Sequence, residues 1–542
     1  MRAGRVAIYN HPMRITALLL LLSLCASQSV YAIGGTPKAA RDWWKHVTFL
    51  ADDKLAGRET GSPGHRRAAE YVAAMFRRAG LRPAGITGYI QPVRFISRRI
   101  LEEQSSLALV REGGRVEPVA LGDEATLGVR INPAARLEAP IVFVGYGLSV
   151  PEMGYDDLAG LDLRGKVVLL LSGGPASIPG PLRSHYQSVR WNALRRAGAV
   201  GVITVQNPKA MDIPWERSTL SRLQPAMTLD DTSLDETAGQ QLAVTINPAR
   251  ADKFFAGSGH SFQELLALAD AGKQLPRFAI PALVRATVKT ETSELESQNV
   301  AGILPGSDPL LKHEYVVVSA HLDHLGTGQP IKGDPIYNGA MDNASGVATL
   351  IETALAARRS GKRLRRPVVF LAVTGEEKGL LGSKYFAAHP ALPPGSSVVA
   401  NVNTDMFLPL FPLRSLIVMG LEESDLAADL RGVAGRAHVE VLSDPEPERN
   451  SFIRSDQYSF IRQGVPAIAL KVGYTRGSPE QEIVKRWRTE RYHAPADDLN
   501  QPLDFQAAAD FNRIFLLIVE AIANRAERPK WNSDSFFRRF AK

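Results

Sequence analysis

Between residues 297 and 530 the chain alternates short, almost wholly apolar runs with segments of helical period. Four of these runs are bounded by turn residues and hold few polar positions, as strands buried on both faces do: 315–320, 367–373, 397–402 and 467–471. The segments with helical period are 344–360, 378–389 and 505–525. This alternation predicts an α/β fold, a three-layer sandwich around a mixed, largely parallel sheet.

Ahead of this region, residues 42–80 have the pattern of helix, loop and helix. Ser62-Pro63 supplies a cap and a first-turn proline for the second helix, and Gly80 ends it. From about residue 105 the pattern changes to short β-like runs with one helical segment: 140–145, 166–171, 188–197 and 200–205. We therefore predict a discontinuous α/β domain over 36–105 and 286–530, with a β-rich region inserted over 106–285.

The N-terminus has the pattern of a cleaved secretory signal peptide, residues 1–32. Three arginines precede the apolar run 15–26, and Val30-Tyr31-Ala32 offers a small-residue cleavage site. The run is shorter than the roughly 20 residues that span a bilayer, which favours cleavage over a membrane anchor. Translation from Met13 would give a more compact signal. We expect an exported protein, periplasmic or extracellular, with no membrane attachment after cleavage.

The composition is that of a globular protein, since 45% of the 542 residues are hydrophobic and 22% are charged. Removing residues 1–32 takes away the single cysteine, Cys25, so thiolate chemistry and disulfides are excluded from the exported chain. It also removes three arginines and no acidic residue, which lowers the net charge from +8 to +5. The remaining basic residues are dispersed, so no nucleic-acid partner is expected.

Side chains that bind metals follow the ends of the predicted strands. His321 and Asp323 follow the first, Glu376 and Glu377 the second, and Asp405 the third. Asp342 stands in a glycine-flanked loop before a helix, and His493 lies in a loop after the last strand. Ligands gather at the carboxyl ends of strands in open α/β sheets, and imidazoles with carboxylates suit zinc or a similar divalent ion.

Five of these residues would complete a site for two ions, with one bridging carboxylate and one histidine and one further carboxylate for each ion: His321, Asp342, Glu377, Asp405 and His493. Glu376 then remains as a free carboxylate beside a ligand, where it can act as a general base. Asp323 can accept the other ring N–H of His321 and fix its tautomer.

Other polar residues are assigned no role in this chemistry. Four histidines lack either the strand-end position or the neighbouring carboxylates, and are expected to be structural or exposed: His313, His324, His389 and His438. The acidic, proline-rich segment 444–448 is expected to be a surface loop. The sequence has no G-x-S-x-G elbow, H-E-x-x-H helix, dinucleotide fingerprint or P-loop.

Five ordered motifs resemble those of the M28 zinc peptidases, the co-catalytic aminopeptidase group that also contains a glutamate-carboxypeptidase-like branch. They are SAHLDHLG (319–326), NGAMDNASG (338–346), TGEEKGLLGS (374–383), NTDM (403–406) and YHAPAD (492–497). The segments FLADD (49–53) and GRETGSPG (57–64) also resemble the start of this family's catalytic domain. Two departures are Met341 before the bridging aspartate, and Gln457 where the family has histidine in a Ser-Asp-His loop.

The resemblance implies a role for each matching residue. Zinc would be held at one site by His321, Asp342 and Asp405 and at the other by Asp342, Glu377 and His493; cobalt or manganese could replace it. Glu376 would be the general base, and Tyr492 would donate a hydrogen bond to the oxyanion. The Asp342-Asn343 peptide would match one that is often cis in the family.

The inserted region resembles a protease-associated domain over about 130–275. The resemblance rests on VGYG (144–147), YDD (155–157) and LDLRGKV (161–167). In family members such a domain can overhang the active site, which implies a lid or substrate gate; a plain spacer is the alternative.

As a whole, the resemblance implies an exported zinc exopeptidase that acts on peptides, with an aminopeptidase favoured. Two enzymatic alternatives stay open. A carboxypeptidase of the glutamate-releasing branch would hold a substrate carboxylate through Arg449, Arg454 or Arg476. A glutaminyl-cyclase-like transferase would use a single zinc. A non-catalytic binding protein on the same scaffold is disfavoured because no ligand is missing. Side-chain preference and oligomeric state are not predicted.

Overall fold

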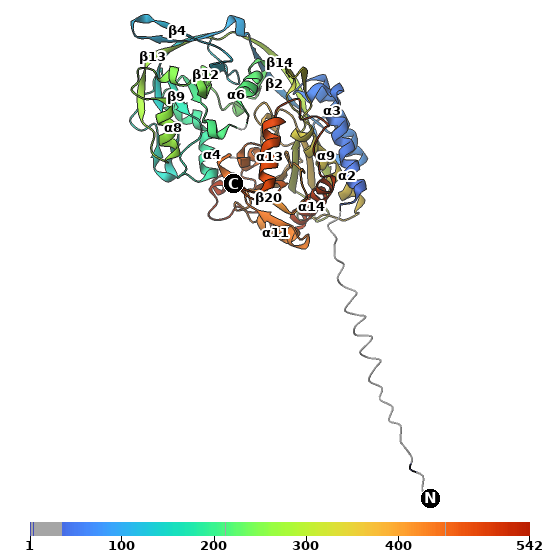
Figure 1. The fold of residues 1–542 in the computed structure, drawn as a ribbon. Coiled ribbons are helices and arrows are strands. Elements are labelled where there is room, and N and C mark those ends of the chain that lie inside the picture. Colours follow the sequence, from blue (N-terminus) through green and yellow to red (C-terminus); the bar gives the residue numbers. More distant parts are fainter. Residues whose placement is uncertain (2–3, 5–34, 212, 450, 542) are drawn as a thin grey trace.

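The computed structural model describes residues 1, 4, 35–211, 213–449 and 451–541 (Figure 1). The predicted signal peptide therefore lies outside the described residues, apart from Met1 and Gly4. No helix in the described ranges has both the length and the apolar composition needed to cross a membrane.

A ten-stranded mixed sheet forms the centre of the α/β part, in the order β11-β2-β14-β18-β15-β19-β22-β20-β21, with β1 paired to β14. Its strands are β1 (Arg82–Pro83), β2 (Ile90–Ile100), β11 (Ala226–Leu229), β14 (Thr290–Leu304), β15 (Glu314–His321), β18 (Val368–Val373), β19 (Ser397–Asn403), β20 (Ser415–Met419), β21 (Glu440–Leu442) and β22 (Ala467–Val472). The central strands β18, β15, β19 and β22 are parallel, whereas β14, β2 and β11 on one side are antiparallel.

Helices cover both faces of this sheet and give the predicted three layers. One face packs through a large apolar core against α2 (Pro37–Leu50), α3 (Pro63–Arg78), α9 (Ser345–Arg359), α11 (Leu426–Arg436) and α14 (Phe505–Asn524) (Figure 1). The other face packs against α10 (Leu381–Ala388) and α12 (Gln457–Ile461). α13 (Pro479–Glu490) precedes the loop that carries His493.

The local signals in the sequence act as expected. The hydroxyl of Ser62 accepts a hydrogen bond from the amide of His65 and caps α3, which begins with a proline. The apolar positions Ala68, Val72 and Phe76 of this helix are fully buried. The four predicted central strands are all present as β15, β18, β19 and β22, with ends that differ from the predicted ones by at most one residue.

A second, eight-stranded sheet lies within the segment predicted to be inserted, in the order β4-β3-β13-β6-β9-β10-β12-β5. Its strands are β3 (Ser106–Arg111), β4 (Val116–Val119), β5 (Ala125–Leu127), β6 (Arg136–Val144), β9 (Val167–Leu171), β10 (Gly201–Val205), β12 (Leu242–Ile246) and β13 (Arg277–Thr287). It has its own apolar core, which includes Phe143, Phe254 and Phe255. The accompanying helices are α4 (Gly180–Ser188), α5 (Arg190–Arg196), α6 (Trp215–Ser218), α7 (Asp252–Phe255) and α8 (Phe262–Asp270).

The two parts are joined by more than a pair of linkers. The long strands β2 and β14 pair along eleven residues and extend from the main sheet toward the second one (Figure 1). Strand β11, which the sequence assigns to the inserted region, pairs with β2 at the edge of the main sheet. Two short hairpins complete the strands: β7 (Ser149–Val150) with β8 (Tyr155–Asp156), and β16 (Gly326–Ile331) with β17 (Asp334–Tyr337).

Candidate metal centre

The five predicted ligands come together at the carboxyl ends of the central strands. His321 is the last residue of β15, Glu377 follows β18, and Asp405 follows β19. Asp342 lies in the turn Ala340–Ala344 that leads into α9, and His493 follows α13. The parallel order of β18, β15 and β19 brings these strand ends to one edge, where Asp342 and His493 meet them.

The distances divide the cluster into two groups. His321 Nε2 lies 3.1 Å from Asp342 Oδ1 and 3.3 Å from Asp405 Oδ1. His493 Nε2 lies 3.3 Å from Asp342 Oδ2 and 3.2 Å from Glu377 Oε2. Two ligand atoms at roughly 2.0–2.2 Å from one tetrahedral zinc lie about 3.3 Å apart, so both groups have the spacing of a zinc site. Asp342 presents one oxygen to each group.

His324 also lies in the cluster. The expectation that it lacks neighbouring carboxylates is wrong, whereas its burial agrees with the expected structural role. Its ring is fully buried, and Nδ1 lies 2.8 Å from Glu377 Oε1 and 3.9 Å from Asp342 Oδ2. The imidazole ring is not oriented for a hydrogen bond to Glu377, and neither ring nitrogen of His324 has a hydrogen-bond partner among the described residues. Two buried polar atoms this close are stabilised by a proton or a metal ion between or beside them. His324, Asp342 and Glu377 form a second possible metal group beside His321, Asp342 and Asp405.

Asp323 accepts the other ring N–H of His321, as predicted, but through its main-chain oxygen and not through its carboxylate. His321 Nδ1 contacts the main-chain oxygen of Asp323 at 3.1 Å. A carbonyl only accepts, so Nδ1 carries the proton and Nε2 faces the carboxylates with its lone pair. The Asp323 carboxylate instead accepts the amides of Glu376 and Glu377 at 3.1 and 3.3 Å. It therefore orients the loop that carries these two side chains.

Two further buried residues hold the loops of the site, and the sequence analysis gave neither a role. Asp497 accepts the amides of Met341 and Asp342 at 2.9 and 3.0 Å, next to the Asp342-Asn343 peptide, which is cis as the resemblance implies. The Arg58 guanidinium donates to the main-chain oxygens of Leu50, Leu322, Asn338 and Gly339. Arg58 belongs to the segment GRETGSPG (57–64) and Asp497 to YHAPAD (492–497). Their place in these two motifs was the sign in the sequence that they have a role.

The electrostatics of the cluster favour bound positive charge. Burial lowers the pKa of His321, but Glu376 and Asp405 raise it, so that it lies well above its ordinary value. His493 behaves in the same way because of Glu377. Protons on the imidazoles and metal ions therefore compete to balance the same carboxylates. Burial raises the pKa of Glu376 well above its ordinary value, with Glu377 and Asp405 adding to the effect.

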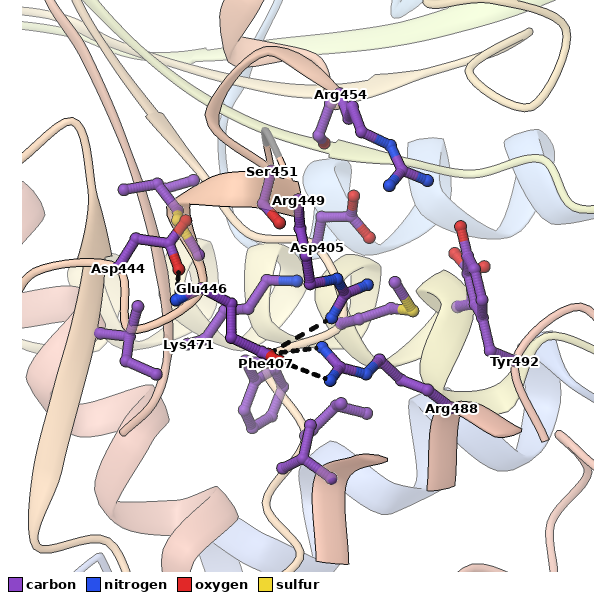
Figure 2. Close-up of a pocket in the computed structure, with 18 of the residues that line it drawn as sticks. Asp405, Phe407, Asp444, Glu446, Arg449, Ser451, Arg454, Lys471, Arg488 and Tyr492 are labelled. Atoms are coloured by element: carbon purple, nitrogen blue, oxygen red, sulfur yellow. Dashed lines mark hydrogen bonds and ion pairs between the residues drawn. The ribbon is translucent and has the colours of Figure 1, made fainter. Parts of the chain in front are cut away.

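A pocket of about 100 Å³ opens beside the cluster and is lined by Glu376, Asp405 and Tyr492 (Figure 2). Burial raises the pKa of Tyr492 to about 12, so its hydroxyl remains a donor at neutral pH. Asp444 and Glu446 also line this pocket, so the expectation that segment 444–448 is only a surface loop is wrong for these two side chains. Gln457 holds the pocket wall, since its Oε1 accepts from the Asn403 side chain at 2.8 Å.

The inserted region reaches the metal cluster directly. Arg130, between β5 and β6, donates a hydrogen bond of 2.7 Å to the main-chain oxygen of Glu377. A second cavity of about 620 Å³ lies between the two parts, lined by Arg130, Trp215 and Arg222 on one side and by Tyr492 and His493 on the other. Any molecule that enters the cluster from this side passes the inserted region.

A three-layer α/β sandwich with histidines and carboxylates gathered at its strand ends is the architecture of a metal-dependent hydrolase. Residues 299–519 match Peptidase family M28. The matched segment holds every residue of the cluster.

Curated relatives and solved structures agree with this assignment. The chain is 27% identical over 322 residues to the "probable leucine aminopeptidase 2" of Aspergillus oryzae, covering 56% of this chain and 59% of the relative. It is 27% identical over 237 residues to "Aminopeptidase YwaD" of Bacillus subtilis, covering 43% and 46%. The chain thus spans about half the length of these relatives. The structure of the "Aminopeptidase from Aneurinibacillus sp. strain AM-1" has the same fold, with a TM-score of 0.54 at 20% identity over 91% of this chain and 94% of that one.

Proposed function

We propose that the chain is an exported aminopeptidase that binds two zinc ions and releases N-terminal residues from peptides. Asp342 would bridge the ions, with His321 and Asp405 on one side and Glu377 and His493 on the other. The observation that carries this proposal is the pair of imidazole Nε2 atoms, each within 3.3 Å of two carboxylate oxygens, with Asp342 common to both groups. The three curated and structural relatives described above are themselves named aminopeptidases.

When bound, zinc would polarise the scissile carbonyl and lower the pKa of water. The protein's own residues would handle the proton and the oxyanion. Glu376 lines the pocket, and its carboxylate has no hydrogen-bond or ion-pair partner among residues 35–541 that the structure describes, so it is free to take the proton from water and pass it to the leaving amine. The Tyr492 hydroxyl would donate a hydrogen bond to the developing oxyanion.

The inserted region would act as a protease-associated lid. The hydrogen bond from Arg130 to Glu377 and the cavity between the two parts support this role.

The test of this function is hydrolysis of a panel of aminoacyl-p-nitroanilides by residues 33–542, with N-blocked peptides as a second panel. We expect cleavage of the free-amine substrates, loss of cleavage after chelation, and its return with zinc. Cobalt and manganese added in place of zinc would report the metal preference. Cleavage of blocked peptides that end in glutamate would instead identify the carboxypeptidase branch, and cyclisation of N-terminal glutamine would identify a cyclase.

Export would follow from cleavage after Ala32. We expect the protein recovered from the periplasm or the medium to begin at Ile33, which intact-mass measurement checks directly. A full-length chain retained in the cytoplasm would contradict export.

A further inference from the structure

Lys471 is the one charged residue of β22, whose other five residues are apolar and buried. Its cross-strand partner on β20 is Ile417, and Ala469 on the same face pairs with Met419. These three apolar residues and Lys471 all line the pocket beside the metal cluster. Lys471 is half-buried on an otherwise apolar strand face, where a negative partner would stabilise its amine.

The Lys471 amine has no such partner among the described residues. It makes no side-chain hydrogen bond there, and no carboxylate of these residues lies within 4.0 Å of it. Burial lowers the pKa of Lys471. The carboxylates of Asp405 and Asp444, more than 4.0 Å from the amine, raise this pKa by less than burial lowers it. Figure 2 shows the Lys471 side chain among the residues that line the pocket, together with Asp405 and Arg449.

Arg449 and Arg488, which line the same pocket as Lys471, already contact a carboxylate of the protein. Arg488 binds the Glu446 carboxylate through both terminal nitrogens, at 2.8 and 3.1 Å, and Arg449 lies 3.5 Å from the same group. The Tyr474 hydroxyl donates to Glu446 at 2.6 Å. The Asp444 carboxylate accepts the amide of Glu446 at 2.8 Å. Apart from the metal ligands, the pocket lining holds three acidic side chains, Glu376, Asp444 and Glu446, against four basic ones: Arg449, Arg454, Lys471 and Arg488.

We propose that Lys471 selects substrates that bring a carboxylate into this pocket, above all peptides with glutamate or aspartate at the N-terminus. The inference rests on the proposed peptidase function and names its substrate class. The apolar walls formed by Ile417, Met419 and Ala469 would pack against the methylenes of the substrate side chain, and the Lys471 amine would bind its carboxylate. The same chemistry is offered by the α-carboxylate of a C-terminal residue, which is the other source of the charge.

The test compares glutamyl- with glutaminyl-p-nitroanilide, because the two side chains have the same shape and differ in charge. For the wild-type holoenzyme we expect kcat/KM for the glutamyl substrate to be about 10-fold to 100-fold higher, the range of a charge-assisted hydrogen bond. Lys471→Met should reduce this ratio to about one, with leucyl-p-nitroanilide cleaved as before, whereas Lys471→Arg should keep the preference. Lys485→Met, an exposed lysine of α13, is the matched control.

Each other result has a distinct meaning. Equal wild-type rates on the glutamyl and glutaminyl substrates, or an equal loss on every substrate in Lys471→Met, would overturn the proposal while leaving the peptidase function intact. If N-blocked peptides are cleaved only with a free C-terminus, and Lys471→Met abolishes that dependence, the bound carboxylate is the α-carboxylate. If no peptide is cleaved, the peptidase function fails, and calorimetric binding of L-glutamate against L-glutamine still tests Lys471.

Discussion

Glu376→Gln is expected to lower kcat by about 10²-fold to 10⁴-fold, the usual contribution of a general base, while zinc content stays at the wild-type level. The amide cannot accept the proton from water, but it keeps the shape of the side chain. Asp323 would still hold the loop, because it binds the amides of residues 376 and 377 and not the Glu376 carboxylate. Steady-state kinetics on the best free-amine substrate and metal analysis of the same sample measure both quantities.

The matched control is Glu440→Gln, an exposed glutamate at the start of β21, which should leave kcat unchanged. A Glu376→Gln enzyme with more than a tenth of the wild-type kcat would remove Glu376 from the role of base. Loss of zinc in this variant would instead assign the residue to metal binding.

Asp342→Asn is expected to remove both zinc ions together and, with them, all measurable activity. Asp342 is the residue shared by the two groups of ligand atoms, with Oδ1 3.1 Å from His321 and Oδ2 3.3 Å from His493. An amide offers one neutral oxygen in place of two charged ones, so neither ion keeps its full set of ligands. The measurement is the number of zinc ions retained per chain after gel filtration, with circular dichroism to verify folding.

His324→Gln provides the contrast for this second experiment. His324 approaches Glu377 at 2.8 Å and lies on one side of the cluster, so its replacement should weaken only the zinc held by Glu377 and His493, by about 10-fold to 100-fold. Retention of two tightly bound ions by Asp342→Asn would refute the bridging role, and loss of both ions from His324→Gln would show that the two sites are not separable.

The central strands and the ligands that follow them could be predicted because they depend on local pattern. Strands buried on both faces are continuous apolar runs in the sequence. His321 and Asp405 directly follow such runs, and Asp342 stands in a glycine-flanked loop before a helix, so their positions indicate metal binding. The long pair β2 and β14 could not be found in this way. Much of β14 is solvent-exposed and polar, as in Glu291 and Glu294, so its stability comes from pairing with β2 and not from a buried face.

The features of the site that the sequence did not reveal depend on packing between distant segments. His324 follows His321 by three residues, but only the fold of the loop decides that its ring faces Glu377. The acidic composition of segment 444–448 indicates a solvated loop, and the approach of Arg488 from α13 is what holds Glu446 in the pocket wall. Asp323 was predicted to accept from His321, but the sequence does not show that its main-chain oxygen makes this contact while its carboxylate binds the amides of Glu376 and Glu377.

Through the pairing of β11 with β2, the inserted region covers what would otherwise be the edge strand of the main sheet. Met227 and Leu229 of β11 are buried with Phe95 of β2 and Leu381 of α10, and the β11 backbone occupies hydrogen-bonding groups of β2 that would otherwise face solvent. An open edge of this kind invites pairing with other chains and aggregation. Without the inserted region, the α/β domain would need another segment to cover the edge of β2.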